Sequence, residues 1–120
     1  MSVFLDHEKF MTACDQSVGI LNEDQFNLYK RLIDEEVEEL NEAIRFSDRV
    51  EMLDALCDIL VVTIGAMHSL GVDSEGAWNE VVRSNMSKID EESGKVLKRG
   101  DGKVLKPDSF SPPNFVPFVK

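Results

Sequence analysis

Two groups of acidic residues, close together in the sequence, are the first candidates for chemistry in this chain. Glu35, Glu36 and Glu39 lie in the run EEVEELNEAI, and Glu51 and Asp54 lie in the run EMLDALCDIL that follows. On a helix with about 100° per residue, Glu36 falls inside the arc of apolar side chains and Glu39 at its edge. An unpaired buried carboxylate costs free energy or takes up a proton. We therefore interpret these acids as ligands of a shared cation.

The expected cation is Mg²⁺, with Mn²⁺ as a substitute. Hard divalent cations take oxygen ligands, and Mg²⁺ typically binds a few carboxylates together with substrate phosphates. Such an ion would also let a chain of net charge -10 accept a polyanionic substrate. The alternative is a solvated acidic face or ion pairs with nearby arginines. For three other acids we prefer this alternative: Asp34, Glu38 and Glu42.

Three further residues have two open interpretations each. Asp58 lies on the same helical stripe as Glu51 and Asp54, and it either supports the metal ligands as a hydrogen-bond acceptor or caps a neighbouring basic group. Asn85 falls in the middle of an apolar helical face, with Lys88 at its edge. This pair is either a buried amide beside a lysine that extends to solvent, or a base- or sugar-binding amide beside a phosphate-binding cation.

The spacing of apolar residues predicts four helices to position these side chains. The predicted helices cover about residues 6–17, 23–46, 49–70 and 74–91. Asn22, followed by Gln25, resembles a capping box, Ser47 and Asp48 form a turn and an N-cap, and Gly71 ends the third helix. Apolar residues surround most of the third helix, which we expect at the centre of the core. The cysteines, Cys14 and Cys57, are predicted to be reduced core thiols.

The last part of the chain differs from the helical part. Residues 95–106 are basic and contain glycine, and the pair Asp101-Gly102 suits a hairpin turn. The prolines that follow favour extended chain. We predict an all-α fold in a single domain, 1–120. It has a four-helix bundle core over about 6–91 and an irregular or short β-ribbon tail over about 92–120.

Composition restricts the partners of the protein. With 13 Lys+Arg against 23 Asp+Glu, neither nucleic acid nor an anionic membrane is an expected partner. The longest apolar stretch, from Ile59 to Met67, is far shorter than the roughly 20 residues that a membrane helix needs. The N-terminus has no signal-peptide pattern, so we expect a cytoplasmic protein. A chain of 120 residues forms only a small core, and this favours a homodimer or homotetramer that shares apolar surface.

These residues resemble a known family. The combination of EExxE at 35–39 with ExxD at 51–54 is similar to the signature of the MazG-like all-α nucleotide pyrophosphohydrolases. Their superfamily includes phosphoribosyl-ATP pyrophosphohydrolase and the dimeric dUTPases. The segments SNMSK at 84–88 and GKVLKP at 102–107 resemble one small single-domain branch. The resemblance covers about residues 20–118.

The resemblance implies a set of site residues. The Mg²⁺ ligands would be Glu35, Glu36, Glu39, Glu51 and Asp54. The nucleotide would contact Asn85 and Lys88, and the phosphates would lie near Lys103 and Lys106 in the tail. The implied fold is a helical bundle whose sites are completed by dimerisation or tetramerisation. At Val61 many members carry an aromatic residue, so the base preference is open.

The function that we predict is metal-dependent hydrolysis in nucleotide metabolism. A nucleoside triphosphate, with dUTP or a non-standard dNTP as candidates, would be cut at the α–β phosphoanhydride to monophosphate and pyrophosphate. Glu35, Glu36 and Glu39 would be catalytic, with Glu35 or a neighbouring carboxylate orienting or deprotonating the attacking water. The alternatives are phosphoribosyl-ATP hydrolysis and a non-enzymatic acidic helical protein that binds a partner.

Overall fold

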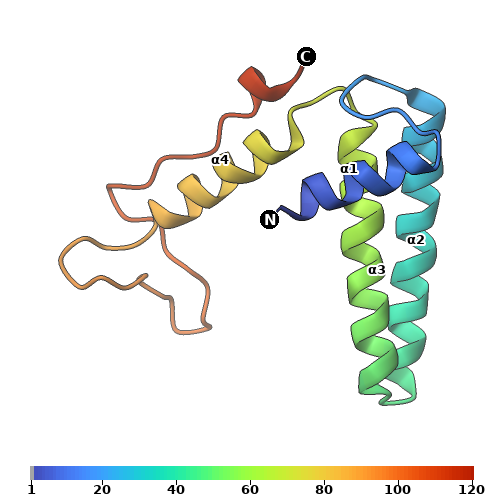
Figure 1. Ribbon diagram of the computed structural model, residues 1–120. Coiled ribbons are helices and arrows are strands. Elements are labelled where there is room, and N and C mark those ends of the chain that lie inside the picture. The colour runs from blue at the N-terminus through green and yellow to red at the C-terminus, as the bar shows by residue number, and fades with distance from the viewer. Residues whose placement is uncertain (1) are drawn as a thin grey trace. The chain divides into compact units, whose positions relative to one another are not determined.

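The computed structural model describes residues 2–120 and is mainly helical (Figure 1). Its helices are α1 (Val3–Ala13), α2 (Glu23–Arg45), α3 (Arg49–His68) and α4 (Ser74–Met86), followed by the short 3-10 helix η1 (Val116–Phe118). No strand is formed within residues 2–120. The predicted all-α class with four helices is therefore confirmed at this level. None of these helices combines the length and the apolar character that crossing a membrane requires.

The chain packs as two compact units. The first comprises the residues up to Ser74 together with Lys120, and the second comprises Glu75–Val119. The first unit contains α1, α2 and α3, and the second contains nearly all of α4, the tail and η1. Each unit is described by itself. The four-helix bundle and the single domain remain predictions.

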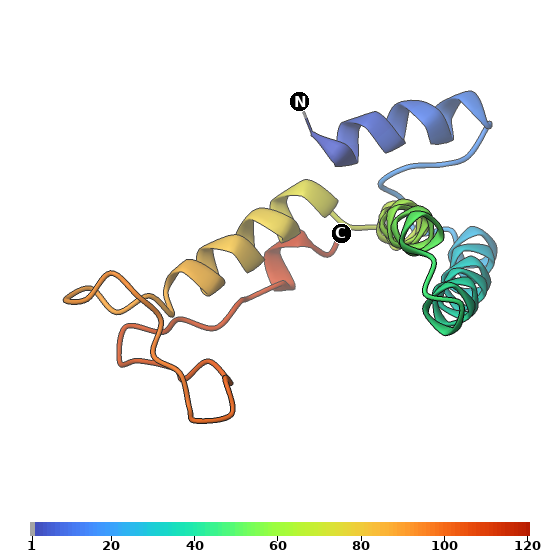
Figure 2. The same ribbon diagram turned by 90° about the horizontal axis from the view of Figure 1, so that it is seen from below.

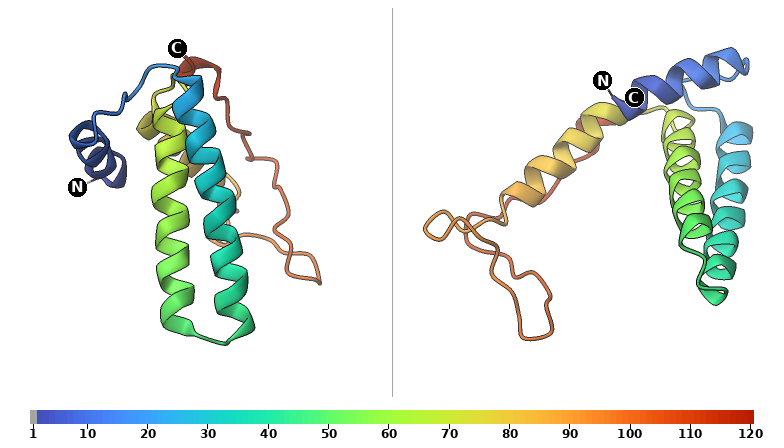
Figure 3. Two further views of the ribbon diagram at one scale, coloured as in Figure 1. Left: turned by 90° about the vertical axis from the view of Figure 1, so that its right-hand side faces the viewer. Right: turned by 60° about the horizontal axis from the view of Figure 1, so that its bottom comes forward.

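An antiparallel pair of helices, α2 and α3, dominates the first unit (Figure 3). Each helix begins at a predicted N-cap. The side chain of Asn22 accepts a hydrogen bond from the Gln25 amide at 3.0 Å, and that of Asp48 accepts from the amides of Val50 and Glu51 at 3.1 Å. The reciprocal half of a capping box is not seen, because the Gln25 side chain binds Ser17 and Ser69. The helices are joined by a tight turn in which Ser47 has a φ of 52°.

The core of the first unit lies near the start of α2 and the end of α3. Its cluster of buried residues is Met11, Tyr29, Val62 and Ala66. Gly65 allows α2 and α3 to approach each other here, because a Cβ at this position would lie only 2.2 Å from Cε1 of Tyr29. His68 ties α1 to α3 through Nε2, which lies 2.9 Å from the carbonyl oxygen of Phe4. The N-terminal helix is thus fixed at one end of the pair.

The second unit is built by the tail running back along α4 (Figures 1 and 2). The carboxylate of Glu80 accepts hydrogen bonds from Arg83 at 2.7 Å and from the Asn114 amide at 2.6 Å. Two isolated β-bridges, Ile89 with Val96 and Lys98 with Val104, replace the predicted ribbon. These bridges do not extend into a sheet, so the tail is irregular.

Two helix boundaries differ from the prediction. The first helix spans Val3–Ala13 instead of about 6–17, because the Ser2 hydroxyl accepts from the amides of Phe4 and Leu5 and starts the helix earlier. It ends before Asp15, whose φ is 60°. The fourth helix ends at Met86 and not near residue 91. The Ser87 hydroxyl donates a hydrogen bond to the Ser84 carbonyl oxygen at 2.6 Å. The same hydroxyl accepts from the Ser111 amide, and it therefore attaches the tail just after the end of α4.

The expected burial of α3 and of the cysteines is wrong for the single chain. Leu53 and Leu60 are each 64% exposed, and Cys14 and Cys57 are both exposed and unpaired. The reason is that α3 has neighbours on only part of its circumference, namely α2 and, near its end, α1. An apolar pattern around a helix predicts burial, but it does not distinguish burial within the same chain from burial against another chain.

Candidate metal centre

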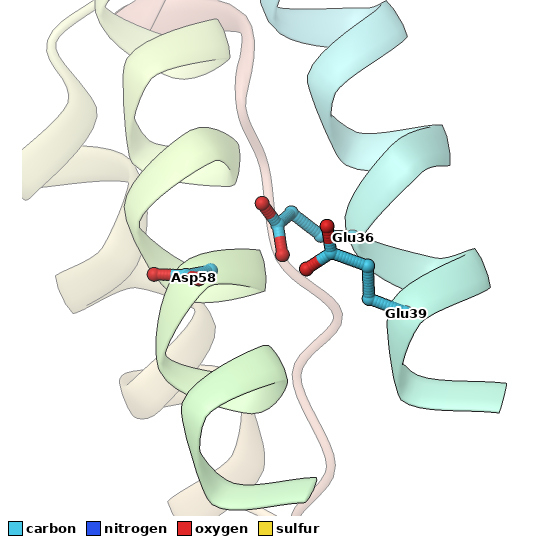
Figure 4. A group of neighbouring side chains, drawn as sticks. All are labelled: Glu36, Glu39 and Asp58. Carbon is cyan, nitrogen blue, oxygen red and sulfur yellow. The ribbon is translucent and has the colours of Figure 1, made fainter. Parts of the chain in front are cut away.

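Three carboxylates from two helices meet between α2 and α3 (Figure 4). Glu36 and Glu39 extend from α2, one turn apart on the same side, and Asp58 comes from α3. One oxygen of each lies within 4.8 Å of one oxygen of each of the others. Within residues 2–120 this is the group of acidic, histidine or cysteine side chains whose geometry could hold a metal ion.

The register of the helix pair explains why Asp58 is the partner from α3. Glu36 lies eleven residues before Ser47 and Asp58 lies eleven residues after it, so the two are level across the antiparallel pair. Glu51 and Asp54 lie closer to the turn, and at about 1.5 Å per residue Asp54 is about 6 Å nearer to it than Asp58. Counting equal steps from the turn would have assigned this place to Asp58 from the sequence.

The carboxyl group of Glu36 is electrostatically unusual. Its pKa is raised to about 7, chiefly because burial disfavours the charged form and because it shares a hydrogen bond with Glu39. The negative charges of Glu39, Asp58 and Asp54 raise it further. Its Oε2 atom is buried and has no hydrogen-bond partner among the described residues. A buried acceptor surrounded by acids lacks the positive charge that would stabilise it.

The other acids predicted as ligands lie around this group without joining it. Glu35 is exposed on α2, next to Glu36. Asp54 is also exposed, although its charge acts on Glu36. Glu51 is exposed and lines an open pocket beside Glu39 at the turn end of the pair. The remaining residues of that pocket are Glu42, Ala43, Phe46 and Asp48. The structure thus brings together Glu36, Glu39 and Asp58.

The predicted substrate-binding residues belong to the second unit. The Lys88 ammonium donates to Oδ1 of Asn85 at 3.2 Å. Asn85 is exposed to solvent, and Lys88 is half-buried. Lys106 is exposed in the tail, and its Nζ lies 5.1 Å from the ring centre of Phe110. Lys103 is exposed, and its amide donates to Asp101 at 3.1 Å. Asn85 is therefore not a buried core amide.

The three clustered residues fit a divalent cation. All their donors are carboxylate oxygens, the ligand type that Mg²⁺ and Mn²⁺ prefer. They come from two helices whose pairing fixes their spacing. The buried and unpartnered Oε2 of Glu36 is the atom that a cation would satisfy. The residues of the first unit are thus suited to bind such an ion.

The fold and the acidic cluster are those of a helical protein with a site suited to a divalent cation. A family described as phosphoribosyl-ATP pyrophosphohydrolase matches residues 10–85, which is more than half of the chain. The chain belongs to this family. A comparison with curated proteins found no match.

Family membership confirms the resemblance to the all-α pyrophosphohydrolases. The matched residues include α2 and α3 with the whole acidic cluster. At the coarse level the chain is therefore a member of a hydrolase family that cuts pyrophosphate linkages. The segment at 102–107 lies outside the match, and its resemblance to one branch remains a sequence prediction.

Proposed function

We propose that the protein hydrolyses a nucleoside triphosphate between the α- and β-phosphates, giving a monophosphate and pyrophosphate, in a Mg²⁺-dependent reaction. The observation that supports this most is the cluster of Glu36, Glu39 and Asp58, with one buried carboxylate oxygen left without a partner. An acidic partner-binding surface would need no such atom, because its carboxylates would face water.

Glu36, Glu39 and Asp58 would hold the cation, with Glu51 and Asp54 as further ligands near the turn. When bound, Mg²⁺ neutralises phosphate charge and lowers the pKa of a coordinated water molecule. The carboxyl group of Glu36 must lose its proton to act as a ligand, and its raised pKa places this loss near neutral pH. Metal binding is therefore expected to strengthen as the pH rises through about 7.

The remaining roles concern the attacking water and the substrate, and Glu35 also remains a proposed metal ligand. Glu35, exposed beside Glu36, would orient or deprotonate the attacking water. The amide of Asn85 would bind the base or sugar. The ammonium groups of Lys88, Lys103 and Lys106 would bind phosphate oxygens, which offsets the repulsion between a polyanion and a protein of net charge -10.

The proposal includes a homodimer or homotetramer in the cytoplasm. The single chain exposes a set of large apolar side chains on α3, and such a set favours association. Its members are Val50, Leu53, Leu56, Leu60 and Val61. Neither nucleic acid nor membrane is part of the proposal, because the net charge of -10 would repel both.

A second substrate has support from the family itself. The description of the matching family names phosphoribosyl-ATP as the substrate. This molecule is also a nucleoside triphosphate derivative that is cut at a phosphoanhydride. The acidic cluster would serve either substrate, because its cation would contact phosphates and not the base. The choice between them depends on residues outside the cluster.

The test is release of pyrophosphate from a panel that contains the common NTPs and dNTPs, dUTP and phosphoribosyl-ATP. Each reaction is run with Mg²⁺, with Mn²⁺ and with EDTA, on the wild type and on Glu36→Gln. We expect at least one substrate to yield monophosphate and pyrophosphate with metal, and none with EDTA or with the variant. A folded wild type that cleaves nothing would contradict the proposal.

A further inference from the structure

One aromatic ring in the second unit has two lysine ammonium groups beside it. The Nζ atom of Lys88 lies 5.7 Å from the centre of the Phe110 ring, and that of Lys106 lies 5.1 Å from it. Both distances are within the range over which a cation is attracted by the face of an aromatic ring. The ring thus gathers two positive charges from positions 18 residues apart in the sequence.

Hydrogen bonds to Ser87 hold the residues on both sides of Phe110. The Ser87 hydroxyl accepts from the Ser111 amide at 2.9 Å, and the Ser87 carbonyl oxygen accepts from the Ser109 hydroxyl at 3.2 Å. The two tail residues that flank Phe110 are therefore attached to the residue that precedes Lys88. The Phe110 amide also donates to the carbonyl oxygen of Pro107 at 2.9 Å, which folds the tail into a turn after Lys106.

The two lysines lie against the same ring although their charges repel each other. Neither forms an ion pair with a carboxylate of the described residues, and Lys88 has only the neutral amide oxygen of Asn85 as an acceptor. This contrasts with Arg83 and Arg99, which are paired with Glu80 and Asp101. The two ammonium groups therefore keep their capacity to bind an anion. Together they can contact more than one phosphate of a linked chain.

We propose that Phe110 is a positioning residue, which holds Lys88 and Lys106 as a pair that binds the polyphosphate chain of the substrate. This inference rests on the proposed function, and it adds to it a residue and a structural reason for the tail. The ring does not touch the phosphates in this arrangement. It reduces the number of conformations that the two long side chains must lose when the anion binds.

The first experiment measures binding of inorganic tripolyphosphate in EDTA, so that the acidic cluster and its metal do not contribute. The variants are Phe110→Leu, which keeps an apolar side chain but removes the ring, and Phe110→Tyr, which keeps the ring. Phe115→Leu is the matched control, because Phe115 is an exposed aromatic residue of the same tail without a described cation over it. We expect about fivefold weaker binding for Phe110→Leu only.

Two further measurements separate positioning from a general loss of structure. In NMR spectra of the wild type, the ε-methylene protons of Lys88 and Lys106 should show ring-current shifts that are lost in Phe110→Leu and kept in Phe110→Tyr. In hydrolysis assays, Phe110→Leu should raise KM by about fivefold and leave kcat within about twofold. A merely structural role would lower the melting temperature without this selective change in KM.

The outcomes distinguish this inference from the proposed function. If the wild type hydrolyses triphosphates but Phe110→Leu binds tripolyphosphate normally and keeps its KM, the role of Phe110 is refuted and the function stands. If no substrate is cleaved but the ring substitution still weakens tripolyphosphate binding, the anion site stands and the function fails. Should Phe110→Leu not fold, normal binding by Lys106→Met would refute the inference equally well.

Discussion

Two glutamates in the two units of this protein have opposite surroundings. Glu80 in α4 accepts hydrogen bonds from Arg83 and from the Asn114 amide, and these lower its pKa to about 2. Glu36 in α2 is half-buried, and the desolvation of its carboxyl group, together with the acids around it, raises its pKa to about 7. The same side chain is thus stabilised as an anion in one unit and destabilised in the other.

The comparison shows how a structural acid differs from a candidate ligand. The charge of Glu80 is satisfied within the chain, where it attaches the tail to α4. The charge of Glu36 is not satisfied by any described residue, and one of its oxygens is buried without a partner. A cation from solution would complete the second arrangement but would add nothing to the first. Four predictions test this difference.

The largest effect is expected for loss of the Glu36 carboxylate. Glu36→Gln should lower kcat/KM by on the order of 100-fold or more, because it removes a charged ligand from the metal. We expect Mg²⁺ to raise the melting temperature of the wild type, and Glu36→Gln should abolish this rise. The measurements are steady-state kinetics and thermal denaturation with and without Mg²⁺. Glu38→Gln is the control, since Glu38 is an exposed acid on the same helix, and an equal loss there would contradict the proposed site.

A disturbance of the helix pair should have the next largest effect. In Gly65→Ala the added methyl group would overlap the Tyr29 ring, and overpacking of this kind costs about 1–3 kcal/mol. For a domain of this size each kcal/mol lowers the melting temperature by about 4–8 °C. The second unit has no part in this contact. A melting temperature that does not change would show that the helix pair accommodates the added methyl group, and it would contradict a tight contact between Gly65 and Tyr29.

The raised pKa of Glu36 predicts how the metal-free protein responds to pH. A carboxyl group whose pKa is higher in the folded state favours folding below its ordinary value of about 4.5, and this contribution is lost as the pH rises through about 7. The melting temperature in EDTA should therefore fall between pH 5 and pH 8, by a smaller amount in Glu36→Gln. Saturating Mg²⁺ should restore it at pH 8. Equal pH profiles for wild type and variant would contradict the assignment.

The smallest effect is expected at Glu80. Its lowered pKa means that it stabilises the folded state above its ordinary value of about 4.5 and loses this contribution as the pH falls through about 2. Glu80→Gln should speed hydrogen exchange of the Asn114 amide and change the melting temperature by less than about 2 °C. If Mg²⁺ were to stabilise this variant less than the wild type, Glu80 would have to be linked to the metal site.

The sequence predicted the helices well because their signals are local. Asn22 and Asp48 begin helices as expected, and Gly71 follows α3 with a φ of 74°. The unusual place of Glu36 was also visible, because a carboxylate inside an apolar arc is local information. The prediction for α3 was wrong because an apolar circumference does not reveal that one chain covers only part of it.

The composition of the acidic group was harder to predict than its existence. Spacing placed Glu51, Asp54 and Asp58 on one stripe, and the family resemblance implied Glu51 and Asp54 as ligands beside Glu36. Asp58 was left open between a residue that supports the ligands and a cap of a neighbouring basic group. The pairing across the two helices depends on the turn at Ser47, and it places Asp58 level with Glu36. A loss of Mg²⁺ affinity in Glu51→Gln or Asp54→Asn would show that these residues also bind the ion.

The exposure of Cys57 has a practical consequence for all of these experiments. This thiol directly precedes Asp58 on α3, and the other free thiol, Cys14, follows α1. The chain thus carries two natural attachment points for alkylating labels, one beside the acidic cluster and one away from it in the sequence. A nitroxide on Cys57 would sense paramagnetic Mn²⁺ bound to the cluster, with Cys14 as the reference. If copies of the chain associate through α3, slower labelling of Cys57 at high protein concentration would report it directly.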